Sequence, residues 1–436
     1  MQRLLLLEFA KYASFQVLGM LGLSCYILAD TFFVSQGLGT QGLAALNLAI
    51  PAYSLVNGVG LMLGMGGATK YAVYKSLSDR REQQVLFPNT LYLTALAACV
   101  FVLTGLFLSD PLAALLGADG TVFDQTRSYL QVILLFAPAF LTNNVVLCFV
   151  RNDGDPRLCM LAMLGGSLSN IVLDYLFLFP LRMGMHGAAI ATGLAPLISL
   201  LILARHWRHK SNQLHLTKAK PELRLVRPIL SLGVPSLVLE VSSGIVMIVC
   251  NAVLLRLEGN VGIAAYGVIA NLSLVAAAVF TGVAQGMQPL VSRAHGRRDT
   301  AQEKQLLRSA LWTIAGLSCG IYLLLYWNAD PIVQLFNREN EPHMQVIAAA
   351  GLKLYFTSAL FMGGNIILSV YFTATERAVP AQLISLGRGL FVIVPLVWLF
   401  SALGGLTGVW LAFPAAECLV ALLGAGLYYA RVSKRR

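Results

Sequence analysis

Long apolar stretches with few charges follow one another along nearly the whole chain. Most are about 20 residues or longer, which is the length that a helix needs to cross the hydrocarbon core of a bilayer. The alternating strands of a membrane barrel would be only about ten residues long. We therefore predict twelve transmembrane helices, at 14–34, 42–66, 86–108, 128–150, 158–180, 184–204, 229–255, 262–287, 309–327, 346–372, 379–400 and 404–430.

The composition supports this class. Of the 436 residues, 57% are hydrophobic and 12% are charged, whereas a soluble domain is roughly a quarter charged. The fold class that we predict is an all-α polytopic membrane protein whose environment is the lipid bilayer. We expect a monomer without an organic cofactor.

The net charge of +11 is distributed unevenly between the loops. Basic residues fall on alternate loops, and the opposite set of loops contains four: Arg127, Arg182, Arg256 and Arg338. This is the positive-inside bias of membrane proteins, and it argues against a nucleic-acid partner. It predicts that both termini are cytoplasmic, in the plasma membrane (a bacterial inner membrane).

The chain partly matches itself when it is shifted by 220 residues. GLAALNLAI at 42–50 aligns with GIAAYGVIA at 262–270, and Asp110-Pro111 aligns with Asp330-Pro331. A duplication of six helices gives two lobes in the same orientation, at 1–212 and 213–436, with the polar segment 206–224 as their linker. Such internal repeats are typical of secondary transporters, which bind substrate between the repeats.

Ionisable residues within the predicted spans are few, and each costs about 2.5–3.5 kcal/mol at a helix centre. They are Asp30, Asp174, Glu240, Arg388 and Glu417. Ser167, Asn170 and Asp174 follow one another at i, i+3 and i+7, so they share one face of the fifth helix.

The first half collects further polar residues, namely Asn143, Asn144 and Thr192. With Asp30, Asn170 and Asp174 they present carboxylate, amide and hydroxyl oxygens, which suit a hard cation such as Na⁺, or a proton. The alternative is that these groups hold helices together by hydrogen bonds. In the second half Asp30 corresponds to Cys250 at the shift of 220, and Asp174 corresponds to Pro395 at a shift of 221. Neither counterpart is an acid, which favours a site specific to the first half.

The remaining charged residues admit more than one interpretation. Arg388 pairs with Glu417 or with Glu240, or one of the glutamates contacts a cationic substrate. Polar and aromatic residues on the second, fifth and eighth spans are candidates for a substrate cavity, with ordinary helix packing as the alternative. Together with Glu240 they are Tyr53, Asn57, Tyr175, Tyr266, Gln285 and Gln288.

Several motifs occur in a fixed order along the chain. They are ADTFFVSQGLGTQGLAAL at 29–46, GLMLGMGGAT at 60–69, NIVLDYLFLF at 170–179, GMHGAAIAT at 184–192, GVP at 233–235 and GMQPLVSRAHG at 286–296. In this order and spacing the sequence resembles the multidrug and toxic compound extrusion (MATE) transporters over its whole length.

This resemblance implies an antiporter that expels amphipathic, often cationic compounds in exchange for Na⁺ or H⁺. In one branch of the family an aspartate on helix 1, an Asn-x-x-x-Asp pair on helix 5 and a threonine on helix 6 form the cation site. Those roles correspond here to Asp30, Asn170, Asp174 and Thr192, with Asn143 or Asn144 from helix 4. Another branch places acids in the second lobe, but 346–372 contains none.

We expect a secondary multidrug antiporter that works by alternating access, and not an enzyme. The alternative is a flippase of related fold for a lipid-linked precursor, which would need a basic cavity for pyrophosphate. No H-E-x-x-H, G-x-S-x-G or phosphate-cradling glycine loop occurs in the sequence.

Overall fold

The computed structural model describes residues 2–120, 122–209, 212–217, 219–337 and 341–433. These residues form helices and connecting loops, and within them there is no strand. Arg338, one of the four basic residues named above, lies outside the described residues. The helices are α1 (Gln2–Ser76), α2 (Arg80–Phe107), α3 (Ser109–Leu115), α4 (Phe123–Leu135), α5 (Ala137–Asp153), α6 (Pro156–Leu178), α7 (Gly184–Leu203), η1 (Ala204–Arg208), α8 (Leu223–Gly296), α9 (Thr300–Trp327), α10 (Ala329–Phe336), α11 (Pro342–Tyr355), η2 (Phe356–Ser358), α12 (Ala359–Ala374), α13 (Ala378–Leu386), η3 (Gly387–Phe391) and α14 (Ile393–Ser433).

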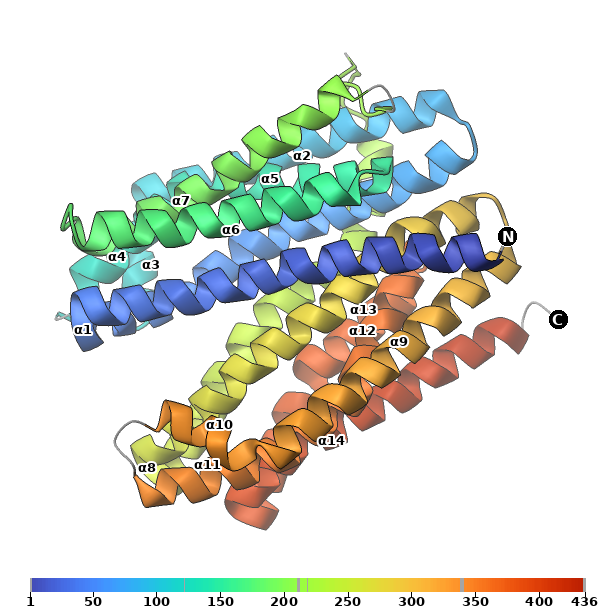
Figure 1. Ribbon diagram of the computed structural model, residues 1–436. Helices are drawn as coiled ribbons and strands as arrows, with labels where there is room; N and C mark the ends of the chain where they lie inside the picture. The colour runs from blue at the N-terminus through green and yellow to red at the C-terminus, as the bar shows by residue number, and fades with distance from the viewer. Residues whose placement is uncertain (1, 121, 210–211, 218, 338–340, 434–436) are drawn as a thin grey trace.

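Twelve membrane crossings result from fewer continuous helical segments. By length and composition, eight helical segments in the described part of the chain are long and apolar enough to span a bilayer, and α4 with α5 adds a ninth that bends by 48°. Three of the nine contain a break in helical geometry, at Gly39, Gly259 and Gly405. Figure 1 shows α1 and α8 reversing direction, so that each of these helices crosses twice. The predicted all-α fold with twelve spans is confirmed.

The backbone repeats the duplication that the sequence indicates. Gly39 has φ 67° and ψ −156°, and Gly259, 220 positions later, has φ 63° and ψ −148°. Both residues have a left-handed φ that a side chain would strain. Asp79 caps α2 and Asp299 caps α9 in the same way, each accepting a hydrogen bond from the backbone N–H three residues later. The two halves therefore share turns and caps as well as helix order.

Each half has its own hydrophobic interior. Buried apolar residues of the first half form two clusters, one of which also includes Leu214 of the linker and Leu225 and Ile229 of α8. Those of the second half form one cluster, which also includes Leu5, Phe9, Tyr12 and Ala13 from the start of α1. In Figure 1 the blue-to-green lobe and the yellow-to-red lobe approach each other near the two termini and diverge toward the turns of α1 and α8.

Glycines let the two lobes touch backbone to backbone on the side of the termini. A Cβ atom at Gly66 of α1 would lie 1.9 Å from the carbonyl oxygen of Ile229 in α8, and one at Gly233 would lie 1.9 Å from that of Met62. A second seam joins the start of α1 to the second crossing of α8, where a Cβ at Gly286 would lie 2.6 Å from the Cα of Ala13. Small residues at such positions permit the close helix approach common in membranes.

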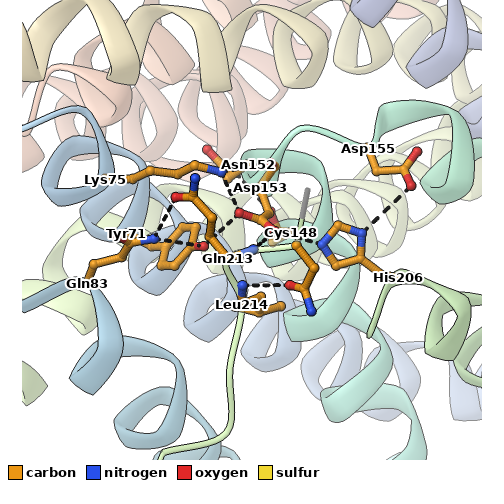
Figure 2. Close-up of polar contacts among 11 residues, drawn as sticks. Tyr71, Lys75, Gln83, Cys148, Asn152, Asp153, Asp155, His206, Gln213 and Leu214 are labelled. Atoms are coloured by element: carbon orange, nitrogen blue, oxygen red, sulfur yellow. Dashed lines mark hydrogen bonds and ion pairs between the residues drawn. The ribbon is translucent and has the colours of Figure 1, made fainter. Parts of the chain in front are cut away.

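A carboxylate at the end of α5 holds the start of the linker between the lobes. Asp153 accepts hydrogen bonds from the hydroxyl of Tyr71 at 2.8 Å, the ammonium of Lys75 at 2.5 Å and the backbone N–H of Gln213 at 3.0 Å. The imidazole Nε2 of His206 lies 2.8 Å from the same carboxylate, and Figure 2 shows these groups converging on it. The linker therefore begins as a docked segment of the first lobe.

The neighbouring Asp155 completes this arrangement from the loop before α6. Its carboxylate lies 3.7 Å from Nδ1 of His206 and accepts a hydrogen bond from the backbone N–H of Leu158. The His206 contact and this backbone bond hold the pKa of the Asp155 carboxyl below its ordinary value, although partial burial opposes them.

Candidate functional site

Three elements of the first lobe bring the predicted cation-site residues into its interior. Asp30 lies on the first crossing of α1, Asn170 and Asp174 lie on α6, and Thr192 lies on α7. The i, i+4 spacing of Asn170 and Asp174 places both on the buried face of α6, where each has a relative exposure of 0%. Asp30 and Thr192 are also buried.

The buried carboxylates at this place lack hydrogen-bond partners among the described residues. Both carboxylate oxygens of Asp174, both amide atoms of Asn170 and Oδ1 of Asp30 are unpaired. The large majority of buried polar groups in proteins are hydrogen-bonded, so an unpaired set of this kind is unusual. Asp30 and Asp174 lie close enough for their charges to interact. The arrangement suits a bound cation or a proton, either of which would supply the missing partner.

The chemistry of this set also fits a monovalent cation better than a metal of the zinc type. The described residues contain no group of three or more His, Cys, Asp or Glu side chains placed to hold a metal ion. Two carboxylates with amide and hydroxyl oxygens form a ligand set typical of hard cations. The hydroxyl of Thr192 at present donates to the carbonyl of Ala188 at 3.0 Å, and its oxygen can still accept or coordinate.

Tyr129 of α4 is a further member of this site that the sequence reasoning missed. It is buried, lies beside Thr192, and its hydroxyl is within electrostatic range of both Asp30 and Asp174. A tyrosine in an apolar span has no sequence pattern that distinguishes a site residue from a packing residue.

Asn144 belongs to a different polar chain, which crosses between the lobes. Its amide donates to Oδ1 of Asn57 at 2.7 Å, and the amide of Asn57 donates to Oε2 of Glu240 at 3.1 Å. A Cβ atom at Gly60 would lie 2.9 Å from Asn144, so the glycine permits this close approach of α1 and α5. Asn143 precedes Asn144 in the sequence. Its side-chain oxygen Oδ1 is buried and has no partner in the part of the chain that the structure describes.

Two tyrosines of α1 pair with each other near this polar chain. The hydroxyls of Tyr26 and Tyr53 are 2.8 Å apart. Tyr53 packs edge-on against Phe140, with ring centroids 5.5 Å apart. Its hydroxyl is within electrostatic range of both Asp30 and Glu240. The hydroxyl of Tyr53 is therefore close enough to feel the charge of both Asp30 and Glu240.

The other predicted cavity residues do not gather at one place. Tyr175 is exposed and contacts Phe33 and Phe179, whereas Tyr266 is buried in the core of the second lobe and stacks on Trp410. Gln285 and Gln288 lie in the contact between the lobes near the termini. Their partners there include Arg151, Asn152 and Thr69.

The structure decides between the alternatives for Arg388. Its guanidinium donates to Oε1 of Glu417 at 2.8 and 3.1 Å, and Asn365 donates to Oε2 of the same glutamate at 2.7 Å. Arg388 lies in η3, a single π-helical turn, a feature found often at functional sites. The charge of Glu417 is thus compensated within the second lobe, and Glu240 has Asn57 as its partner.

Comparison with known proteins identifies the fold and the family. The sequence model of the MatE family matches residues 16–176 and 235–399, well over half of the chain and both lobes. The chain belongs to the MatE family. Its members are the MATE transporters, which the motif order had indicated, so this MatE protein is a membrane transporter and not an enzyme.

The alignments with individual relatives extend over nearly the whole of this MatE chain. The multidrug export protein MepA of Staphylococcus saprophyticus is 24% identical over 406 residues, which are 93% of this chain and 89% of the staphylococcal protein. A multidrug resistance MATE transporter of the MOP superfamily, solved in an outward-facing conformation, superposes with a TM-score of 0.92 at 24% identity, over 98% and 96% of the two chains.

A further solved structure shares the fold. It is a MOP superfamily transporter from Pyrococcus furiosus, with a TM-score of 0.91 and 24% identity over 98% of this chain and 95% of that chain. Its description reports a reversed polarity of the binding pocket and suggests a different function for that protein. The function of this MatE chain has therefore to be argued from its own residues.

Proposed function

We propose that this transporter exports amphipathic and organic cationic compounds in exchange for Na⁺ or H⁺. The observation that carries the proposal is the pair of buried acids in the first lobe. Both carboxylate oxygens of Asp174 and Oδ1 of Asp30 are unpaired among the described residues. The staphylococcal relatives are multidrug export proteins, which supports the same assignment.

The mechanism follows from the cost of holding two acids together in an apolar interior. Burial and mutual repulsion both disfavour the doubly charged state, so the pair has a strong tendency to take up a cation or a proton. Uptake neutralises the site and favours one arrangement of the lobes, and a cationic drug favours the other. Exchange requires that each ligand bind the two arrangements unequally.

In this proposal Asp30, Asn170, Asp174 and Thr192 bind the coupling cation, and Tyr129 adds a hydroxyl. Tyr26 and Tyr53 connect that site to Glu240, which lies at the junction of the lobes and is available to a cationic substrate. The protein acts as a monomer in the plasma membrane, with both termini and the basic loops in the cytoplasm.

A flippase for a lipid-linked precursor is less well supported. Recognition of pyrophosphate favours free guanidinium or ammonium groups in the cavity. Arg388 is held by Glu417, so the charge that the sequence offers for such a role is already compensated.

Transport in liposomes tests the proposal. Purified protein is reconstituted with an imposed Na⁺ gradient or, separately, a pH gradient, and ethidium movement is followed by fluorescence. We expect transport under one gradient, and its loss in the Asp174→Asn variant. The matched control is Asp124→Asn, which alters an exposed acid at the start of α4. Absence of transport under both gradients, or full activity of Asp174→Asn, would contradict the proposal.

A further inference from the structure

A groove lies between the first three turns of α8 and the helix α13. It has a volume of about 630 Å³, and apolar side chains of α8, among them Val226, Leu230 and Val234, line most of it. Gln382 of α13 lines it as well and donates a hydrogen bond from Nε2 to the carbonyl oxygen of Ser231 at 2.8 Å. This bond joins the two helices at the groove.

The length of the groove matches one leaflet of a bilayer. Val226, Leu230 and Val234 follow one another at a spacing of four residues, so they lie along one side of the helix. The lining runs from Leu223, the first residue of α8, to Val234, a rise of about 16 Å at 1.5 Å per residue. Half of the hydrocarbon core is roughly 15 Å thick. An apolar groove of this length at the start of a membrane crossing fits one acyl chain.

Positive charge lies at the end of the groove that is nearest the start of α8. Arg227 lines it, is exposed, and has no acidic partner among the described residues. A second, polar hollow shares Leu223 with the groove and is lined by Arg81, which is likewise exposed and without an ion-pair partner in the described ranges. Arg224 differs, because Glu82 and Glu222 hold it at 2.7 and 2.6 Å. Two guanidinium groups are therefore available to an anion.

The direction of these side chains agrees with a headgroup position. Side chains on a helix lean toward its N-terminus, so Arg227 is directed toward the start of α8 and away from the apolar interior. Arginine binds phosphate groups with paired hydrogen bonds. Basic pockets at the ends of membrane helices are common sites for anionic lipids.

We propose that this groove binds one anionic phospholipid, with an acyl chain along Val226, Leu230 and Val234 and its phosphate at Arg227 and Arg81. The charge of the two free arginines selects an anionic headgroup over a zwitterionic one. The apolar lining selects a lipid over a free anion. This site is separate from the acids of the first lobe and does not depend on the transport that we propose for them.

Native mass spectrometry of the detergent-purified protein tests this site. Wild type is titrated with dioleoyl phosphatidylglycerol and, separately, with dioleoyl phosphatidylcholine. We expect the first equivalent of phosphatidylglycerol to bind more tightly than that of phosphatidylcholine. Arg227→Gln should weaken the binding of phosphatidylglycerol by about fivefold, the effect expected for the loss of one basic residue near an anionic headgroup. Leu230→Trp, which fills the groove, should weaken both lipids.

Arg308→Gln is the matched control, because Arg308 is an exposed arginine near the start of α9 and outside the groove. Equal binding by wild type and Arg227→Gln, or an equal loss in Arg308→Gln, would overturn the site. Inorganic phosphate is added as a competitor. Displacement of the lipid by phosphate alone would show a site for free anions and would also overturn the proposal. Melting temperatures confirm that each variant is folded.

Discussion

The guanidinium Nη1 of Arg151, at the end of α5 in the first lobe, donates a 2.6 Å hydrogen bond to Oε1 of Gln285 on α8 of the second lobe. The same nitrogen donates to Gln16 of α1 at 3.0 Å. Arg151 is buried and its Nε atom has no partner in the described part of the chain. Next to it Asn152 donates to Gln288 of α8 at 2.9 Å. The end of α5 thus joins the two lobes on the side of the termini.

Removing Arg151 should loosen this contact between the lobes. In Arg151→Ala both glutamine oxygens lose a charged donor, and hydrogen bonds of this kind contribute roughly 1.5–3 kcal/mol each. Cys148 is a native reporter, because it is buried and lies 3.6 Å from Nη2 of Arg151. With the other cysteines replaced by alanine, we expect maleimide to label Cys148 about tenfold faster in Arg151→Ala.

Arg157→Ala serves as the control for this labelling, since Arg157 is an exposed arginine at the start of α6. Its rate should match that of the parent protein. Equal rates in Arg151→Ala and Arg157→Ala would show that Arg151 does not hold the lobes together.

Asp153→Asn should release the linker from the first lobe. The amide would offer an N–H₂ group to a site where Tyr71, Lys75 and the backbone of Gln213 all donate, and breaking a buried ion pair costs about 3–5 kcal/mol. We expect a lower melting temperature and faster tryptic cleavage after Arg208, which is exposed in the linker. Asp155→Asn should have a smaller effect, because asparagine caps a helix about as well as aspartate.

Gly66→Ala should force the lobes apart where α1 meets α8. The new Cβ would lie 1.9 Å from a backbone oxygen of Ile229, and the backbone cannot turn aside as a side chain can. Overpacking of this kind costs about 1–3 kcal/mol, measured as a lower unfolding temperature in detergent. Gly244→Ala, on α8 with no atom within 4 Å of its Cβ, should be neutral or slightly stabilising. Similar melting temperatures for both variants would contradict the prediction.

Glu240→Gln separates the charge of this residue from its hydrogen bond. Glutamine still accepts from the amide of Asn57, so the fold should be preserved. If Glu240 binds the cationic substrate, the KM for ethidium should rise about tenfold, equivalent to about 1.4 kcal/mol. Glu240→Ala should also lower the melting temperature, since it leaves the Nδ2 group of Asn57 without its acceptor. An unchanged KM in Glu240→Gln would limit Glu240 to a structural role.

The sequence predicted what depends on periodicity and repetition. The apolar segments indicated the crossings, and the 220-residue shift indicated a duplication, to which the matching turns at Gly39 and Gly259 correspond. The spacing of Asn170 and Asp174 placed both on one buried face. These features are local, or are copied from one half to the other, so a single chain contains enough information to predict them.

Contacts between distant segments were beyond prediction from the sequence. Arg388 had two glutamates as possible partners, and only the packing of η3 against α14 selects Glu417. Gln285 and Gln288 are polar residues of the kind that lines cavities. In the structure they contact Arg151 and Asn152 where the two lobes meet. The short helices α3 and α10 were missed because each is too brief for a periodic pattern to be recognised.

The turns at Gly39 and Gly259 have a mechanical consequence. Because α1 and α8 each reverse through a single non-helical residue, the two crossings on either side have no intervening loop in which to absorb motion. We therefore expect the two crossings of each pair to move together. A rearrangement of the lobes then has to bend elsewhere, and the linker that Asp153 fastens to the first lobe leads from η1 into α8.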